Sequence, residues 1–283
     1  MALYAVTGSS SGMGSHVVAK LRADGHTVIT VDLADADVAA DLSTPAGRRG
    51  AAADVLTACS GRLDGAVLAA GLGPTPGAER LITEVNYFGV VDLLTAWRPA
   101  LAAADRAKVV VFSSNSSTTV PAVPRRAVRA LLAGDADKAM RAYPLFGRAA
   151  PAMAYAASKI AVSRWVRRHA VMPQWAGAGI RLNALAPGAI MTPMLERQLA
   201  TPDEAKRIEW FPVPIGGFGD AGALADWVVF MLSDSADFLC GSVVFVDGGS
   251  DAYFRADDWP RAVPIRRVAY YLWRARKFGE RNR

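Results

Sequence analysis

Tyr155 and Lys159 are the two residues whose types and spacing most directly predict chemistry. They lie four residues apart in a helix-favouring stretch, so they share one helical face with Cβ atoms about 5–6 Å apart. A free tyrosine titrates near pH ~10, and a neighbouring ammonium favours the phenolate, which moves the phenol toward acid/base chemistry at neutral pH. Alone, such a pair is more often an amphipathic surface contact, so the rest of the chain must decide between the two interpretations.

A glycine-rich turn near the amino terminus predicts a dinucleotide site. The apolar residues 3–6 lead into Thr7-Gly8-Ser9-Ser10-Ser11-Gly12-Met13-Gly14, and an apolar helical pattern follows. Glycines at a strand-to-helix turn allow a tight bend, close approach of backbone N–H groups to a pyrophosphate, and close packing of the helix. The spacing differs from G-x-G-x-x-G, but the turn follows a strand and opens a helix, as such a site requires.

Asp32 follows the second apolar run, residues 27–31, and predicts which dinucleotide is bound. A carboxylate at this position accepts hydrogen bonds from the adenosine ribose and repels a 2′-phosphate, and Ser11 adds no positive charge to the turn. The sequence therefore predicts NAD as the cofactor, in preference to NADP. The alternative interpretation is an aspartate that caps a turn.

Short apolar runs alternate with helical patterns along most of the chain. Strands are predicted at residues 3–6, 27–31, 65–69, 108–112, 180–184 and 242–246, and the helices between them include 82–101, 155–171 and 224–232. Repeated βα units form a parallel sheet with both faces covered and with ligands at the carboxyl ends of its strands. The predicted fold class is α/β, with a doubly wound parallel sheet of the Rossmann type in a single domain over residues 1–254.

The distribution of charge argues against general binding of nucleic acid. The formal net charge is +6, but residues 255–283 hold nine Lys/Arg and three Asp/Glu out of totals of 32 and 26, which leaves 23 of each sign in residues 1–254. A neutral body with a basic carboxyl-terminal extension predicts no nucleic-acid partner.

The remaining composition predicts a cytoplasmic protein without a metal site. The amino terminus enters a strand at once, without the pattern of a signal peptide. Cys59 and Cys240 are isolated, and the three histidines form no ligand or catalytic arrangement. No apolar run approaches the ~18–20 residues that a membrane span needs.

Several motifs, in this order along the chain, together resemble the short-chain dehydrogenase/reductase family over residues 2 to about 252. They are Thr7-Gly-x-x-x-Gly12-x-Gly14, Val85-Asn86-Tyr87-Phe88-Gly89, Ser114 at a strand end, Tyr155-x-x-x-Lys159, Arg181-Leu182-Asn183-Ala184-Leu185-Ala186-Pro187-Gly188 and Asp247-Gly248-Gly249. Within the family the chain is most similar to the bacterial 3α-hydroxysteroid dehydrogenase/carbonyl reductase group. That likeness lies in residues 41–44, 63–74 and 85–89 and in the long interval between Ser114 and Tyr155.

The resemblance implies a catalytic set of Asn86, Ser114, Tyr155 and Lys159. Tyr155 would donate a proton to a carbonyl oxygen as hydride arrives, or remove one from an alcohol in the reverse direction. Lys159 would lower the pKa of Tyr155 and hold the nicotinamide ribose. Ser114 would hydrogen-bond the substrate oxygen, and Asn86 would support a water and backbone relay behind the lysine.

The resemblance also implies which residues bind NAD. The predicted cofactor-binding residues are Thr7, Gly8, Ser11, Gly12, Met13, Gly14, Asp32, Leu33, Asp41, Leu42, Ala70, Gly71, Tyr155, Lys159, Pro187, Gly188, Ile190 and Thr192.

The loop after Gly188 closes over the substrate in this family, and in this chain it is apolar. The predicted substrate residues are Ser114, Tyr155, Met191, Met194, Leu195 and Trp210. Their bulk suits a small hydrophobic alcohol or ketone, including a 3α-hydroxysteroid or 3-ketosteroid, although such residues also pack against the protein body. Two alternatives stay open, a lipid-like or terpenoid alcohol as substrate and a non-catalytic protein that responds to NAD.

Two segments depart from the family pattern. Residues 115–152 predict a helical hairpin broken at Gly134-Asp135, in which Asp135 caps the second helix. The hairpin forms either a subunit interface or a substrate lid, and a homo-oligomer is expected. Residues 255–283 form a basic extension with apolar residues at helical spacing, which predicts either a peripheral membrane helix or docking on the body or a second subunit. These apolar residues are Ile265, Val268, Ala269, Leu272 and Trp273.

Overall fold

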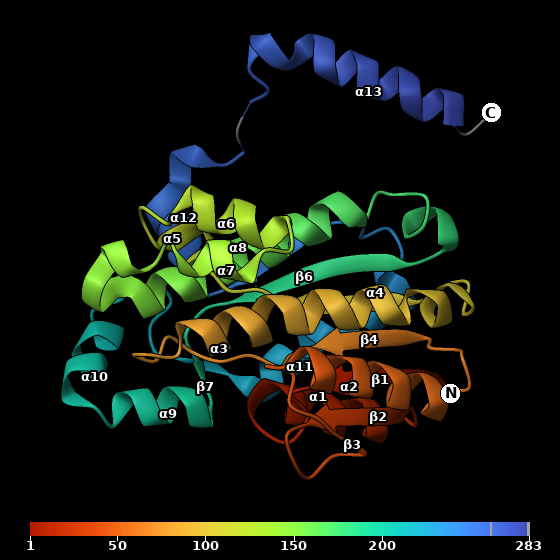
Figure 1. Ribbon diagram of the computed structural model, residues 1–283, viewed down its shortest axis with the longest axis horizontal. Helices are drawn as coiled ribbons and strands as arrows, with labels where there is room; N and C mark the ends of the chain where they lie inside the picture. Colours follow the sequence, from red (N-terminus) through yellow and green to blue (C-terminus); the bar gives the residue numbers. More distant parts are fainter. Residues whose placement is uncertain (261, 282–283) are drawn as a thin grey trace.

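The computed structural model describes residues 1–260 and 262–281 (Figure 1). Arg261 and residues 282–283, which belong to the predicted basic extension, lie outside the described residues. The core is a seven-stranded parallel sheet with the strand order β3-β2-β1-β4-β5-β6-β9, which confirms the predicted α/β fold. The strands are β1 Leu3–Thr7, β2 Thr27–Asp32, β3 Val38–Ala39, β4 Gly65–Leu68, β5 Lys108–Phe112, β6 Arg181–Pro187 and β9 Val243–Val246.

Helices cover both faces of the sheet, because successive strand residues point to opposite sides. Ala5 packs into one hydrophobic cluster and its neighbour Val6 into the other. The first cluster includes residues of α2 Pro45–Ala58, α4 Gly89–Ala102 and α8 Ala150–His169. The second includes residues of α1 Gly12–Ala23 and α11 Ala221–Leu232. Both clusters continue under the carboxyl ends of the strands, so that edge has a rigid support.

Shorter elements surround this edge. They are α3 Glu79–Thr83, a π-helical turn at Glu84–Phe88, α5 Ser116–Thr119, the paired strands β7 Ile190–Met191 and β8 Gly219–Asp220, α9 Pro193–Leu199, α10 Pro202–Glu209 and α12 Ser250–Arg255. Most of them lie between a strand end and the helix that follows, where parallel sheets bind ligands.

The segment 115–152 contains the two helices expected there, α6 Arg125–Leu132 and α7 Ala136–Met140. Gly134 separates them with φ +77°, and the Asp135 side chain caps α7 by accepting a hydrogen bond of 2.8 Å from Lys138 N. Val128 and Leu131 are buried as α6 packs against α8, and α7 packs against α3. The apolar side of this hairpin is therefore used inside the chain itself.

The carboxyl-terminal extension ends in the helix α13 Val268–Arg281. Figure 1 shows it apart from the sheet, beyond the helices α6, α8 and α12. All described side chains from residue 262 to residue 278 are exposed. The sequence left open whether this apolar face docks on the body of the same chain. The structure does not show such docking, because these side chains are exposed.

Candidate active site

The glycine turn between β1 and α1 has no room for side chains at two positions. Gly8 adopts φ +67°, and a Cβ on it would lie 2.6 Å from Ala70 N. A Cβ on Gly14 would lie 2.0 Å from Gly8 O, so only glycine lets α1 approach the turn this closely. The side chain of Ser11 does not cap α1, which leaves the first N–H groups of the helix available to a phosphate. This cradle fits a dinucleotide pyrophosphate.

Asp32 lies at the end of β2, beside the glycine turn. Its Oδ2 accepts a hydrogen bond of 2.9 Å from Ser10 N, and its Oδ1 accepts one of 2.7 Å from Leu33 N. These bonds hold the carboxylate where the ribose of an adenosine would lie in a doubly wound fold. Leu33 is 70% exposed and offers an apolar surface next to it. The geometry therefore suits the ribose diol and opposes a phosphate on it.

The other predicted residues of the adenine side are placed less directly. Asp41 accepts a hydrogen bond of 2.9 Å from Ser43 N, and hydrogen bonds from Ser43 lower the pKa of its carboxyl group. Leu42 is buried in the hydrophobic core. Its backbone can border a ligand, but its side chain packs inside the protein.

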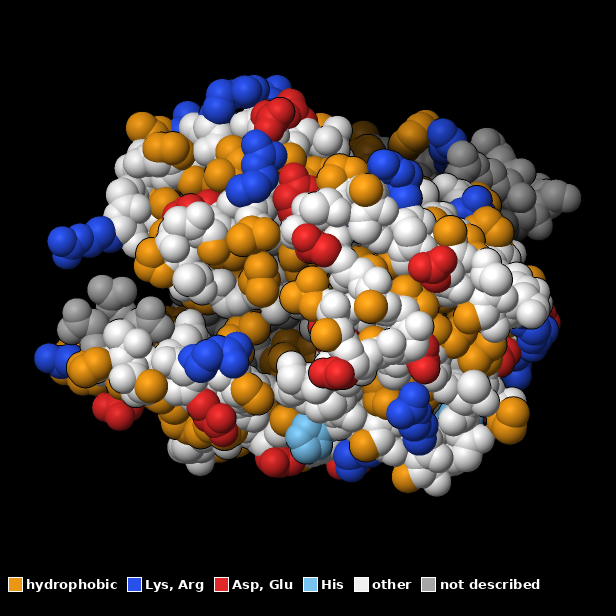
Figure 2. Space-filling view, turned by 60° about the horizontal axis from the view of Figure 1, so that its bottom comes forward, with side chains coloured by type: hydrophobic (Ala, Val, Ile, Leu, Met, Phe, Trp, Pro, Cys, Tyr) orange, Lys and Arg blue, Asp and Glu red, His pale blue; other side chains and the backbone are white. Residues whose placement is uncertain are grey.

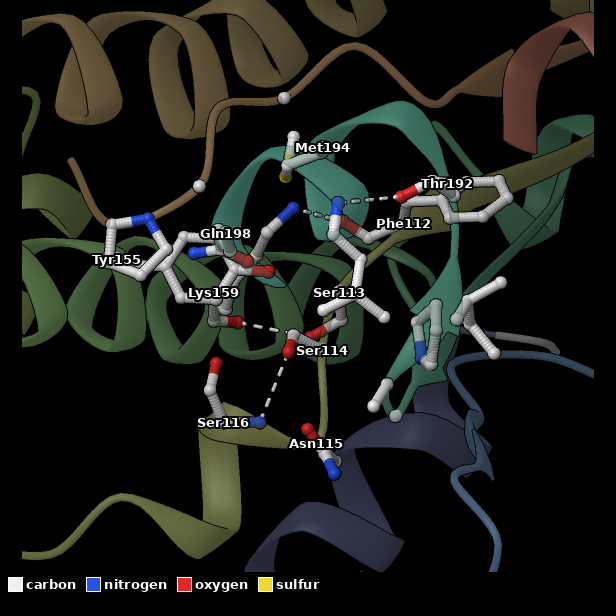
Figure 3. A pocket seen from close by; sticks show the side chains of 18 of the residues that line it. Phe112, Ser113, Ser114, Asn115, Ser116, Tyr155, Lys159, Thr192, Met194 and Gln198 are labelled. Atoms are coloured by element: carbon white, nitrogen blue, oxygen red, sulfur yellow. Dashed lines mark hydrogen bonds between the residues drawn. The ribbon is translucent and has the colours of Figure 1, made fainter. Parts of the chain in front are cut away.

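Ser114, Tyr155 and Lys159 lie around one cavity at the carboxyl end of β5 (Figure 3). Ser114 comes two residues after β5, and Tyr155 and Lys159 lie one turn apart on α8. Lys159 Nζ donates a hydrogen bond of 2.8 Å to Phe112 O and lies 5.8 Å from the centroid of the Tyr155 ring. Ser114 Oγ accepts a hydrogen bond of 3.1 Å from Ser116 N. The structure thus brings together three residues that are up to 45 positions apart in sequence.

Burial dominates the pKa values of the two titratable groups. It raises the pKa of Tyr155, while a hydrogen bond with Ser114 acts in the opposite direction. Burial also lowers the pKa of Lys159 from its ordinary value of 10.5 to about 8. The predicted lowering of the pKa of Tyr155 is therefore corrected, because removing both groups from water favours their neutral forms. A phenol that keeps its proton at neutral pH is suited to donate it.

Asn86 lies behind this cavity in the π-helical turn Glu84–Phe88 and is fully buried. Its Oδ1 accepts a hydrogen bond of 2.7 Å from Leu72 N, and its Nδ2 donates one of 2.9 Å to Leu72 O. A Cβ on Gly71 would lie 3.3 Å from Asn86 Oδ1 and 3.7 Å from Lys159 Nζ. Asn86 therefore fixes the loop after β4 and lies close behind the lysine. Single π-helical turns of this kind occur frequently at functional sites.

The cavity has a volume of about 360 Å³ and a mostly apolar lining. Figure 2 shows a hollow bordered by hydrophobic side chains on this face of the molecule. Six of the predicted cofactor-binding residues contribute to the lining: Met13, Gly71, Pro187, Gly188, Ile190 and Thr192. Thr192 also caps α9 by accepting a hydrogen bond of 3.3 Å from Leu195 N. A Cβ on Gly12 would lie 3.6 Å from the Thr192 methyl carbon, so the loop after β6 reaches the glycine turn.

Only part of the predicted substrate set borders the cavity. Met194 and Leu195 line it, but Met191 and Trp210 do not. Trp210 is 79% exposed, with Lys206 Nζ 5.6 Å from its ring centroid, because α10 turns this position toward solvent. Other residues of α9, α10 and the loop after them face inward, and they lie outside the predicted substrate set. They are Gln198, Ile208 and Phe211. The loop's apolar character indicated a lining, but only the path of α10 shows which side chains face it.

Residues 115–120, at the start of the long interval before Tyr155, also border the cavity. Asn115, Ser116, Thr119 and Val120 belong to its lining, whereas the apolar sides of α6 and α7 pack on α8 and α3. The helical part of the segment is thus a structural layer, and its amino-terminal end contributes to the site.

The described residues hold neither a cluster of metal ligands nor a helix that could cross a membrane. Within them, no group of three or more His, Cys, Asp or Glu side chains is arranged to hold a metal ion. Among the helices that the structure describes, none has the length and apolar character to cross a membrane.

The sheet order, the glycine cradle and the Ser114, Tyr155 and Lys159 arrangement define a dinucleotide-dependent oxidoreductase of the Rossmann type. Comparison with known proteins agrees. A family described as enoyl-(acyl carrier protein) reductase matches residues 144–251. The chain is 38% identical over 255 residues to a 3-alpha-hydroxysteroid dehydrogenase/carbonyl reductase of Comamonas testosteroni, covering 90% of this chain and 98% of that protein. The chain therefore belongs to the short-chain dehydrogenase/reductase family.

Two further relatives have related chemistry in their names. A 2-(S)-hydroxypropyl-CoM dehydrogenase of Xanthobacter autotrophicus is 31% identical over 265 residues, which cover 88% of this chain and 96% of that protein. Among solved structures, the 3-alpha-hydroxysteroid dehydrogenase of Pseudomonas sp. B-0831 complexed with NADH superposes with a TM-score of 0.85 at 42% identity. That match covers 90% of this chain and 99% of the solved chain.

Proposed function

We propose that this protein uses NAD(H) to interconvert a hydrophobic secondary alcohol and the corresponding ketone, with Tyr155 as the acid/base. The observation that carries the proposal is the convergence of Ser114, Tyr155 and Lys159 on one apolar cavity. Asp32 and the glycine cradle support NAD as the cofactor, in line with a solved relative that is complexed with NADH.

NADH bound in the cradle would supply the hydride for carbonyl reduction. In that direction Tyr155 donates its phenolic proton to the carbonyl oxygen, and in alcohol oxidation the phenolate takes the hydroxyl proton. Ser114 holds the same oxygen by a hydrogen bond and stabilises its developing charge. Lys159, held by its hydrogen bond to Phe112 O, positions the cofactor ribose and places its Nζ, a hydrogen-bond donor, near the Tyr155 ring. Because burial raises the pKa of Tyr155, reduction is favoured at neutral pH and oxidation gains as the pH rises.

The cavity and the names of the relatives support a class of substrate. The part of the cavity lined by Leu195, Ile208 and Phe211 suits a rigid apolar skeleton with one oxygen at the reacting carbon. Two relatives are named 3-alpha-hydroxysteroid dehydrogenases, so a 3α-hydroxysteroid and its 3-ketosteroid are the proposed pair. A terpenoid or other lipid-like alcohol is the competing substrate in the same chemical class.

We expect a cytoplasmic homo-oligomer whose basic extension makes peripheral contact with a membrane. A hydrophobic substrate partitions into membranes, so such a contact would bring the enzyme to its supply.

Turnover by purified protein tests the function directly. NADH oxidation is measured with a panel of 3-ketosteroids, cyclic terpenoid ketones and small ketones, and NAD⁺ reduction with the matching alcohols. Tyr155→Phe should lower kcat by about 10²–10⁴-fold and leave NADH binding intact, because general acid–base catalysis contributes that much. Tyr143→Phe is the matched control, since Tyr143 is a buried tyrosine outside the cavity lining. Equal rates for Tyr155→Phe and wild type would rule out the proposed proton donor.

A further inference from the structure

The helix α13 carries apolar and aromatic side chains that point into solvent. Leu272 is 59% exposed and Trp273 is 53% exposed. A helix of 14 residues is marginal by itself in water and is usually stabilised by packing of its apolar face. The match to the Comamonas relative covers 98% of that protein with only 90% of this chain. The exposed apolar face of α13 would be stabilised by a binding partner.

The chemistry of the extension identifies the kind of cover. Between Trp259 and Phe278 the sequence has six basic residues and no acidic one. Two of the cations lie over aromatic rings: Arg274 Cζ lies 6.0 Å from the centroid of the Tyr270 ring, and Lys277 Nζ lies 4.9 Å from that of Trp273. Tyr270 stacks on Trp273 at 6.0 Å between centroids. Helices with Lys and Arg on one face and Trp and Leu on the other are typical of membrane surfaces that carry anionic lipids.

A groove lined by arginines lies between α13 and the end of α8. Its volume is about 360 Å³, and its described lining has no acidic side chain. The lining residues are Arg164, Arg167, Arg168, Val171, Met172 and Arg274. Burial lowers the pKa of Arg164, and the nearby charges of Arg168 and Arg125 lower it further, so like charges lie close together here. An anion with several oxygen atoms would relieve this repulsion, and guanidinium groups bind phosphate oxygens in pairs.

The groove and the apolar face lie on opposite sides of α13. Arg274 faces the groove, and at about 100° per residue Leu272 lies about 160° away around the helix. If the Leu272 side enters the acyl boundary of a bilayer, the Arg274 side stays at the level of the headgroups. The arginines of α8 face that same layer from the body of the enzyme.

We propose that α13 and the arginine groove form one binding site for an anionic phospholipid surface. The apolar face of α13 enters the membrane interface, and the groove holds headgroup phosphates between α13 and α8. This site makes the proposed peripheral contact specific for anionic lipid, and it does not depend on the oxidoreductase activity.

Co-sedimentation of the full-length protein with vesicles tests the site. Vesicles of phosphatidylcholine alone are compared with vesicles that also contain phosphatidylserine. Wild-type protein should bind the second kind, and added salt should weaken binding. Arg164→Gln/Arg168→Gln should weaken it at least about tenfold, because each basic residue near an anionic surface contributes about fivefold. Leu272→Ser should also weaken it at least about tenfold, because a buried leucine face is lost.

Matched controls separate the groove from net charge. Arg22→Gln/Arg49→Gln removes two exposed arginines from α1 and α2, which lie at the opposite end of the molecule from α13 in Figure 1, and should bind like wild type. Arg167 is left intact, because it donates a hydrogen bond of 3.2 Å to Gly241 O. Circular dichroism and NADH turnover without vesicles, which should not change, show that each variant is folded.

Three results would overturn the proposal. They are binding that does not require phosphatidylserine, unchanged binding of the groove variant, and a dimer in light scattering that dissociates in Leu272→Ser, since a second copy would then cover α13. Vesicle binding without any turnover would reject the proposed function and leave this site standing. Turnover without vesicle binding would reject this site and leave the proposed function standing.

Discussion

Replacing Lys159 by methionine should change how the stability of the protein depends on pH. The side chain is 5% exposed, and burial lowers its pKa from 10.5 to about 8. Methionine has a similar length and no charge to desolvate. The substitution therefore isolates the free-energy cost of burying the Lys159 ammonium when the protein folds.

The sign and size follow from the two pKa values. Below pH ~8 the lysine is charged in both the folded and the unfolded state, so the whole cost of burying the charge opposes folding. As the pH rises from about 8 toward 10.5, the folded state loses its proton first and the cost disappears. A shift of about 2.5 units corresponds to roughly 3 kcal/mol, of which about 2 kcal/mol should be recovered between pH ~6.5 and ~9.5.

Chemical unfolding of wild type and Lys159→Met across that range measures the effect. The variant also leaves Phe112 O without its 2.8 Å hydrogen bond, at a cost of about 1–3 kcal/mol that does not vary with pH. The difference in unfolding free energy between the two proteins should therefore move by about 2 kcal/mol in favour of wild type as the pH rises. A difference that stays constant from pH ~6.5 to ~9.5 would refute the reasoning, because Lys159 would then titrate alike in both states.

Three further substitutions test the supports of the site. Gly14→Ala should abolish NADH binding and destabilise the fold by about 1–3 kcal/mol in thermal unfolding, because its Cβ would lie 2.0 Å from a backbone oxygen. Gly50→Ala is the control, because Gly50 has open space around it inside α2, and it should stabilise the fold by up to about 1 kcal/mol. Equal effects of the two alanines would exclude the steric explanation. Asp32→Ala should weaken NADH binding in calorimetry by about ten- to a hundredfold and improve NADPH binding, and an unchanged ratio of the two affinities would place the ribose elsewhere. Arg48→Met should lower the unfolding free energy by about 2–3 kcal/mol, because Arg48 is 5% exposed and its loss leaves Asp92 without its cation and Glu84 with only the 3.5 Å pair to Arg80. A loss below ~1 kcal/mol would show that the pairs are solvated.

The strands and the main helices could be predicted because their signals are local. Residues 109–112 are apolar, and all five side chains of β5, including the ion-paired Lys108, are buried, as expected for a central parallel strand. Tyr155 and Lys159 could be paired because four residues make one turn of helix, whatever surrounds it. Asp32 could be placed beside the glycine turn because both lie at the carboxyl ends of neighbouring parallel strands.

Side-chain direction and burial could not be predicted in the same way. Trp210 and Phe211 are adjacent and equally apolar in the sequence, yet the end of α10 turns the first to solvent and the second into the cavity. The groove between α8 and α13 has no local signal, because Arg164 and Arg274 come from distant parts of the chain.

The sequence by itself determined the α/β fold, the glycine cradle and the spacing of Tyr155 and Lys159, because periodicity, chain flexibility and helical pitch act over a few residues. Only the tertiary structure decided that burial raises the pKa of Tyr155 and lowers the pKa of Lys159. It also decided that the side chains of α13 are exposed where they are described. The physical reason is that desolvation depends on all the atoms packed around a group, and those atoms come from strands and helices far apart in the chain.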